Sequence, residues 1–103
     1  MSRIYVIRLS AKVLAESKFM ERNPTYQQGK PCFYVGMTGR TPQIRFMQHK
    51  AGYKSNKYTK KYGLWLAKKK FQHIRPLNYE EAKKKEKSLA EDLRQRGYGV
   101  WQN

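Results

Sequence analysis

Acidic residues and cysteines are scarce in this chain of 103 residues. There are 7 Asp and Glu against 23 Lys and Arg, which gives a formal net charge of +16. The one cysteine, Cys32, excludes an internal disulfide, and with only 2 histidines it excludes a structural zinc site of the Cys/His type. So few carboxylates also disfavour a two-metal phosphodiesterase centre, which needs several converging Asp and Glu side chains.

Long apolar runs are missing too. No stretch is long enough for a transmembrane helix, and the first residues lack the apolar segment of a secretory signal. We therefore expect a cytoplasmic protein with no membrane partner. Hydrophobic residues make up 39% and aromatic residues 14% of the chain, which is enough for the modest core of a single domain over residues 1–103.

Positive charge is concentrated in the middle of the chain. Residues 22–79 contain no carboxylate and carry 13 Lys and Arg. Each Lys or Arg that contacts a phosphate releases condensed counterions, so a polyanion is the expected partner. We expect DNA, with RNA as an open alternative, bound by a monomer or a weak homodimer. The expected contacts with the nucleic acid are Lys50, Lys54, Lys57, Lys60 and Lys61.

The hydrophobic pattern predicts strands over 3–9, 32–37 and 71–74, with a short closing strand over 97–101. The first two strands are expected to pair. Helices are predicted over 11–22, 42–51 and 79–96 from runs of helix formers and from end signals, such as Pro42 after Thr41. A basic helical segment is predicted to start over 55–62 and to continue through Gly63 into residues 64–66.

In the helix over 42–51, Ile44, Met47 and Ala51 fall on one apolar stripe. Arg45 and His49 stand one turn apart on a different face. Four other residues with distinctive side chains are expected to serve packing or structure: Cys32, Trp65, His73 and Trp101.

One glutamate falls where the last helix should be apolar. Ala82, Leu89 and Leu93 form its apolar stripe, and Glu86 completes the spacing, so we expect this carboxylate to face the body of the domain. A buried carboxylate is costly unless it is paired or bound to a metal. Glu86 therefore either pairs with a Lys or Arg or reaches solvent at the edge of the stripe, or it is a metal ligand in a basic cleft.

Five features follow one another along the chain: Ile4-Tyr5-Val6, Tyr34-Val35-Gly36, Arg45, His49 and Glu86. Their order and placement resemble the GIY-YIG nuclease superfamily over nearly the whole chain, from residue 4 to residue 101. Each tripeptide alone is a weak signal, because aromatic-rich strands are common. Together the five features are specific.

The resemblance implies an α/β fold with a small three-stranded, mixed antiparallel sheet flanked by helices and an active site on one sheet face. The chain departs from the family pattern in two residues, Arg3 in place of glycine and Val35 in place of isoleucine, and neither change removes a reactive group. The first two strands are also further apart than is typical, so residues 10–31 are interpreted as an insertion.

The resemblance also implies roles for the motif residues. Tyr5 and Tyr34 would lie beside the scissile phosphate, with Tyr5 as general base or water positioner, although a phenol is a poor base unless nearby positive charge lowers its pKa. Arg45 would stabilise the charge that develops on the phosphate oxygens. His49 would position or activate the water or hydrogen-bond to Tyr5, and Gly36 would let the backbone approach the nucleic acid closely.

Glu86 would hold one Mg²⁺, with Mn²⁺ as a possible substitute, whose other ligands are water and phosphate oxygens. The expected function is therefore a metal-dependent endonuclease that hydrolyses DNA by a one-metal mechanism with a tyrosine-assisted water. The alternatives are a catalytically silent basic nucleic-acid-binding module on the same scaffold and a protein-interaction or inhibitor domain.

Overall fold

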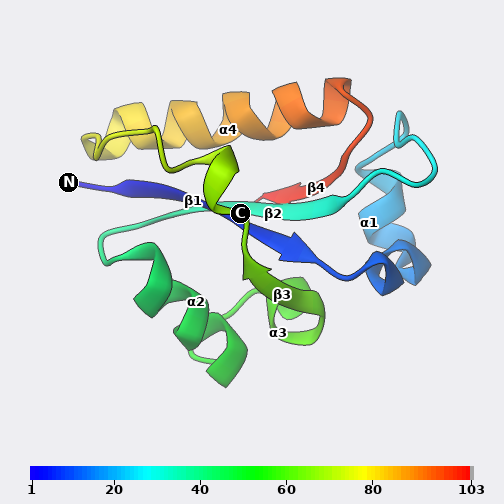
Figure 1. Cartoon of the computed structure of the whole chain (residues 1–103), viewed down its shortest axis with the longest axis horizontal. Coiled ribbons are helices and arrows are strands. Elements are labelled where there is room, and N and C mark those ends of the chain that lie inside the picture. Colours follow the sequence, from blue (N-terminus) through cyan, green and yellow to red (C-terminus); the bar gives the residue numbers. More distant parts are fainter. Residues whose placement is uncertain (103) are drawn as a thin grey trace.

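Four strands form one mixed sheet in the order β3-β1-β2-β4 in this computed structural model, which describes residues 1–102 (Figure 1). β1 pairs antiparallel with both β2 and β3, and β2 pairs in parallel with β4. The strands are β1 (Arg3–Leu9), β2 (Cys32–Thr38), β3 (Gly63–Leu66) and β4 (Gly99–Gln102).

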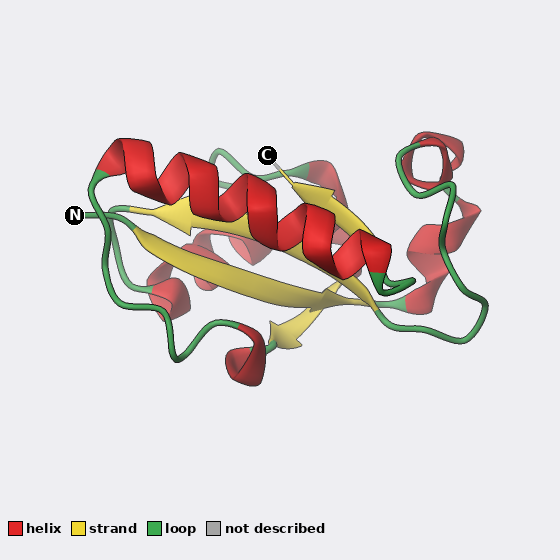
Figure 2. Cartoon of the chain, turned by 90° about the horizontal axis from the view of Figure 1, so that it is seen from above, coloured by secondary structure: helices red, strands yellow, loops and turns green. Residues whose placement is uncertain are grey.

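Helices lie on both faces of the sheet. The longest, α4 (Tyr79–Gln95), runs along one face, and α2 (Pro42–Ala51) and α3 (Lys57–Tyr62) lie against the other (Figure 1). Figure 2, a view from above, shows α4 lying over the strands of the sheet. Within residues 1–102, no helix combines the length and the apolar character needed to cross a membrane. Three short elements complete the order: the 3-10 helix η1 (Ala11–Ala15), α1 (Ser17–Glu21) and the 3-10 helix η2 (Lys68–Lys70).

The pairing of β1 with β2 fixes which side chains share a face. Tyr5 lies opposite Gly36, and Ile7 lies opposite Tyr34. Because side chains alternate along a strand, Tyr5, Ile7 and Tyr34 point to the same face. This is the face toward α2, since both tyrosine rings lie against His49 of that helix. Ile4 and Val6 point the other way and are also buried, so both faces of β1 carry core residues.

The sheet has four strands instead of the expected three, and one predicted strand is wrong. Residues 71–74 form a turn and its exit, whereas the third strand is Gly63–Leu66, in the segment predicted to stay helical. Gly63 allows the change from helix to strand, because a Cβ at this position would collide with the carbonyl oxygen of Thr59 where the chain leaves α3. The closing strand predicted over 97–101 is confirmed as β4.

The helix predicted over 11–22 is split in two. Glu16, between η1 and α1, has extended backbone angles and accepts a hydrogen bond from the Tyr62 hydroxyl. After α1, the buried side chain of Asn23 donates to the carbonyl of Val100 and accepts from its N–H, at 3.0 and 2.8 Å. These bonds fix the segment between β1 and β2 to β4 at the edge of the sheet.

The apolar stripe of α2 faces solvent, and Trp65, expected to serve packing, is exposed. In α2, Met47 is 69% exposed and Ile44 is 42% exposed, while His49 is buried, so the helix turns a polar side chain toward the sheet. Its hydrogen bonds within the core offset the cost of burying it. Trp65 on the edge strand β3 is 54% exposed, whereas Cys32 is buried as predicted.

Candidate active site

Two tyrosines and a histidine meet between the sheet and α2. The hydroxyl of Tyr5 on β1 lies 2.8 Å from Nε2 of His49 on α2. The ring centroid of Tyr34 on β2 is 6.1 Å from that of Tyr5 and 5.4 Å from that of His49. All three side chains are buried, so the cluster is held rigidly by the core around it.

The neighbours of His49 determine which ring nitrogen carries the proton. The backbone N–H of Asn56 lies 3.3 Å from Nδ1, and the Thr59 hydroxyl lies 3.0 Å from the same nitrogen. A backbone amide can only donate, so Nδ1 is an acceptor and the proton of the neutral ring is on Nε2. Burial and the nearby charge of Arg45 lower the pKa of His49 to about 4, which keeps the ring neutral. Nε2–H therefore donates to the oxygen of Tyr5.

Gly36 gives the Tyr5 phenol its place over β2. A Cβ at Gly36 would lie 2.5 Å from the Tyr5 hydroxyl oxygen and 3.0 Å from a ring carbon of Tyr34. Real Cβ atoms essentially never approach that closely, so any side chain here would displace the phenol. Gly36 is thus required for the geometry of the tyrosine pair.

Arg45 lines an open cleft of about 860 Å³ at the end of β2. Its guanidinium donates to the carbonyls of Tyr53 and Lys54 at 3.1 and 2.7 Å. These bonds hold the loop that follows α2 and fix the direction of the guanidinium. Thr38, Arg40 and Lys54 also line the cleft, so three cationic side chains face the same space.

Glu86 lines a second cleft, of about 500 Å³, on the α4 side of β2. Its side chain is buried, as predicted. The two ion pairs among residues 1–102 join Lys61 to Glu16 and Arg96 to Asp92, so an ion pair does not explain this burial. Burial raises the pKa of Glu86 to about 7. A carboxylate in this state gains from a cation that binds beside it.

The two clefts adjoin at Thr38 and Gly39, which line both. β4 pairs with β2 only as far as Val35, opposite Gln102, so in the described part of the chain the outer edge of β2 is unpaired beyond this point. Burial and the negative charge of Glu86 raise the pKa of Tyr34 to about 12.

Neighbouring groups act in opposite directions on the pKa of each of the two tyrosines. Burial and the Tyr34 phenol raise the pKa of Tyr5 well above its ordinary range, while the positive charge of Arg45 acts to lower it. Arg45 acts in the same direction on Tyr34. Tyr5, Tyr34 and His49 thus form one cluster on the α2 face of the sheet, near enough to Arg45 for its charge to act on all three. Glu86 lies on the opposite, α4 side of β2, so it departs from the expected placement of the whole site on one sheet face.

A metal ion at this site would have one carboxylate ligand from the protein. Among residues 1–102, no three His, Cys, Asp or Glu side chains gather closely enough to hold a metal. Mg²⁺ keeps several water ligands and binds proteins through one or two carboxylates. A buried carboxylate without an ion pair, beside an open cleft, fits Mg²⁺ or Mn²⁺ and does not fit a zinc site of several protein ligands.

The lysines expected to contact nucleic acid differ in their surroundings. The ammonium of Lys50 donates to two carbonyls at the end of α3, at 2.9 and 3.0 Å, so it caps that helix. Lys61 lies 3.7 Å from a carboxylate oxygen of Glu16. Three lysines are exposed and form neither an ion pair nor an ammonium hydrogen bond within the described residues: Lys54, Lys57 and Lys60.

Sequence reasoning missed the two residues that hold His49. Asn56 shows a visible signal, because it caps α3 by accepting from the N–H groups of Tyr58 and Thr59. No feature of the nearby sequence indicates that the N–H of Asn56 and the hydroxyl of Thr59 contact His49 on the preceding helix.

No protein-family model, no curated protein and no solved structure matches this chain.

Proposed function

We propose that the protein is a metal-dependent endonuclease of the GIY-YIG type that hydrolyses phosphodiester bonds in DNA. The observation that carries this proposal is the buried Tyr5–His49 hydrogen bond, on which the charge of Arg45 acts. Arg45 lines one of two adjoining clefts and Glu86 lines the other. A phosphate at Thr38 and Gly39 would have a cationic side chain on one side and a carboxylate that can hold a cation on the other.

Each residue has a role in this reaction. A water attacks phosphorus, forming one P–O bond as the P–O3′ bond breaks. The proton that it loses passes to solvent water, and the leaving 3′ oxygen takes up a proton from solvent. Tyr5 orients the attacking water through its oxygen, and Nε2–H of His49 stabilises negative charge on the phenol oxygen by donating to it. Because burial raises the pKa of Tyr5, its action as a base requires nearby positive charge.

Arg45 supplies part of that charge. Its guanidinium, held by the carbonyls of Tyr53 and Lys54, would stabilise the charge that develops on the phosphate oxygens, and a preorganised donor of this kind contributes about 10²–10³ in rate. Mg²⁺ or Mn²⁺ at Glu86 would stabilise the leaving 3′ oxygen as a Lewis acid.

A catalytically silent nucleic-acid-binding module is the second candidate. The observation that favours it is that the Arg45 guanidinium already donates to Tyr53, Lys54 and Gln48 and so has few free donors. A binding module would need the cationic cleft and would have no use for a buried carboxylate at Glu86.

Plasmid nicking separates the two candidates. We expect the wild type to nick supercoiled DNA with Mg²⁺ and not with a chelator, and Glu86→Gln to lose about 10²-fold or more in rate. Glu91→Gln, an exposed acid on the same helix, is the matched control and should nick normally. Glu86→Gln should bind DNA at least as well as the wild type. An inactive wild type with every divalent metal and every form of DNA or RNA would establish the silent module instead.

A further inference from the structure

An exposed tryptophan lies on the far side of the sheet from the tyrosine cluster. Trp65 of β3 pairs with Arg8 of β1, and the Arg8 guanidinium lies 5.7 Å from the centroid of the indole. Alternation along β1 directs Arg8 away from the face that carries Tyr5 and Ile7. Trp65 therefore lies on the face opposite the tyrosine cluster, and the hollow that it borders shares no lining residue with the clefts of Arg45 and Glu86.

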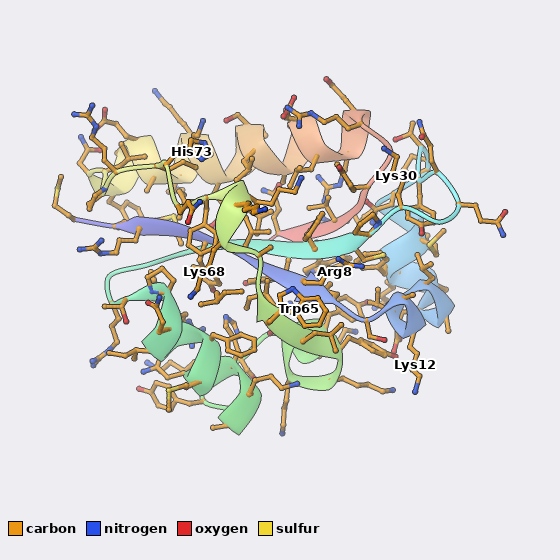
Figure 3. All side chains as sticks on the ribbon, in the orientation of Figure 1. Arg8, Lys12, Lys30, Trp65, Lys68 and His73 are labelled. Carbon is orange, nitrogen blue, oxygen red and sulfur yellow. The ribbon has the colours of Figure 1, made fainter. Side chains whose placement is uncertain are left out.

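Trp65 borders a hollow of about 360 Å³ with aromatic and cationic walls. Phe33 and Tyr98 form further aromatic walls, with ring centroids 5.4 Å apart in an edge-to-face arrangement. The lysines of η2, Lys68–Lys70, line the same hollow. Its lining contains no carboxylate. In Figure 3, Arg8 lies beside Trp65, with Lys68 on one side and Lys30 on the other.

Two ammonium groups converge on one aromatic ring here. Nζ of Lys30 and Nζ of Lys70 lie 4.9 and 4.8 Å from the centroid of Tyr98. Neither lysine forms an ion pair within residues 1–102. Like charges drawn to one place repel each other, and a bound phosphate would offset that repulsion. The surface is thus complementary to an anion that also carries flat apolar groups.

We propose that this hollow binds single-stranded nucleic acid by stacking a base on Trp65 and holding the adjoining phosphates with the lysines of η2. Proteins that bind single strands combine cationic grooves with aromatic side chains in this way, since every base has a π-face. Duplex bases are already stacked on each other and cannot reach the indole. The hollow would hold a single strand whether or not the chain cleaves it.

Fluorescence of the tryptophan tests the proposal without any cleavage. The chain has 2 tryptophans, so Trp101→Phe leaves Trp65 as the single reporter. In the presence of a chelator, we expect oligo(dT) or oligo(U) to quench this fluorescence. An abasic oligomer of equal length should bind through its phosphates and quench little. Duplex DNA should behave like the abasic oligomer.

Affinity measurements give the second readout. Trp65→Ala should weaken oligo(dT) binding by about 5- to 100-fold, the effect of losing one base stack, and should leave duplex binding unchanged. Leu64→Ala is the matched control, because Leu64 is an exposed apolar residue on the same strand and does not line the hollow. Equal quenching by the abasic oligomer, or equal weakening of duplex binding, would overturn the stacking proposal. Polyglutamate binding with the same dependence on Trp65 would assign the surface to an acidic protein instead.

Discussion

The Tyr5 hydroxyl accepts a hydrogen bond from Nε2 of His49 across 44 positions of sequence, at 2.8 Å in a buried cluster. His49→Ala leaves the phenol buried without this partner, so we expect the free energy of unfolding to fall by about 1–3 kcal/mol. Nicking should fall as well, because the phenol loses its orientation. Urea unfolding and nicking rates measure the two effects, and full activity in a folded His49→Ala protein would refute the role assigned to His49.

The close approach of Gly36 to Tyr5 predicts a sharp difference between two glycines of one segment. Gly36→Ala forces the phenol to move, which should destabilise the protein by about 1–3 kcal/mol and abolish most nicking. Gly39→Ala places its Cβ in open space, outside the left-handed region of φ, and should cost little stability. Thermal unfolding of the two variants makes the comparison, and equal effects would contradict the packing seen around Tyr5.

The contacts behind these predictions explain what the sequence could reveal. The polar position of Glu86 within an apolar stripe is a local signal, so its burial was predictable. The orientation of α2 was not predictable, because apolar Ile44 and Met47 are exposed while His49 is buried against residues remote in sequence. The face that α2 turns toward the sheet follows the long-range hydrogen bonds of His49 and not the apolar stripe of the helix.

Strand β3 was missed for a related reason. β3 has only four residues and directly follows a basic helix, so its sequence is too short to show the alternation of a strand. Only the geometry at Gly63 reveals that the chain must leave the helix there. The segment over 71–74 has apolar residues only at its two ends, yet only Phe71 in it is buried and it forms a turn. Four residues without a pairing partner do not make a strand.

Burial of Glu86 predicts an unusual dependence of stability on pH. Its pKa is raised from 4.5 to about 7 in the folded protein, so the folded state holds a proton that the unfolded state releases. Stability from this group is present below pH 4.5 and is lost as pH rises through about 7. We expect Glu86→Gln to be more stable than the wild type at pH 8, by on the order of 3 kcal/mol, and equally stable near pH 4.

His49 has the opposite effect over nearly the same range. Its pKa falls from 6.5 to about 4 on folding, so its contribution is present above pH 6.5 and is lost as pH falls through about 4. The two contributions offset each other in the wild type between about pH 4.5 and 6.5. Urea unfolding at several pH values should therefore show stability rising with pH in Glu86→Gln. If the variant and the wild type respond identically to pH, Glu86 is not buried in the way described.

Lys50 and Lys60 are expected to differ in role, Lys50 stabilising the fold and Lys60 contacting nucleic acid. Lys50 donates to two carbonyls at the end of α3, so Lys50→Met should lower the free energy of unfolding by about 1.5–3 kcal/mol and change the salt dependence of DNA binding little. Lys60 is exposed and forms no ion pair in the described part of the chain.

Lys60→Met should leave stability nearly unchanged and reduce the slope of log affinity against log salt by about 0.9, the loss of one phosphate contact. Binding titrations over a series of salt concentrations measure these slopes. If Lys50→Met instead changed the salt slope of DNA binding and Lys60→Met changed the free energy of unfolding, the roles of the two lysines would be reversed. The nucleic acid would then follow a different path across α2 and α3.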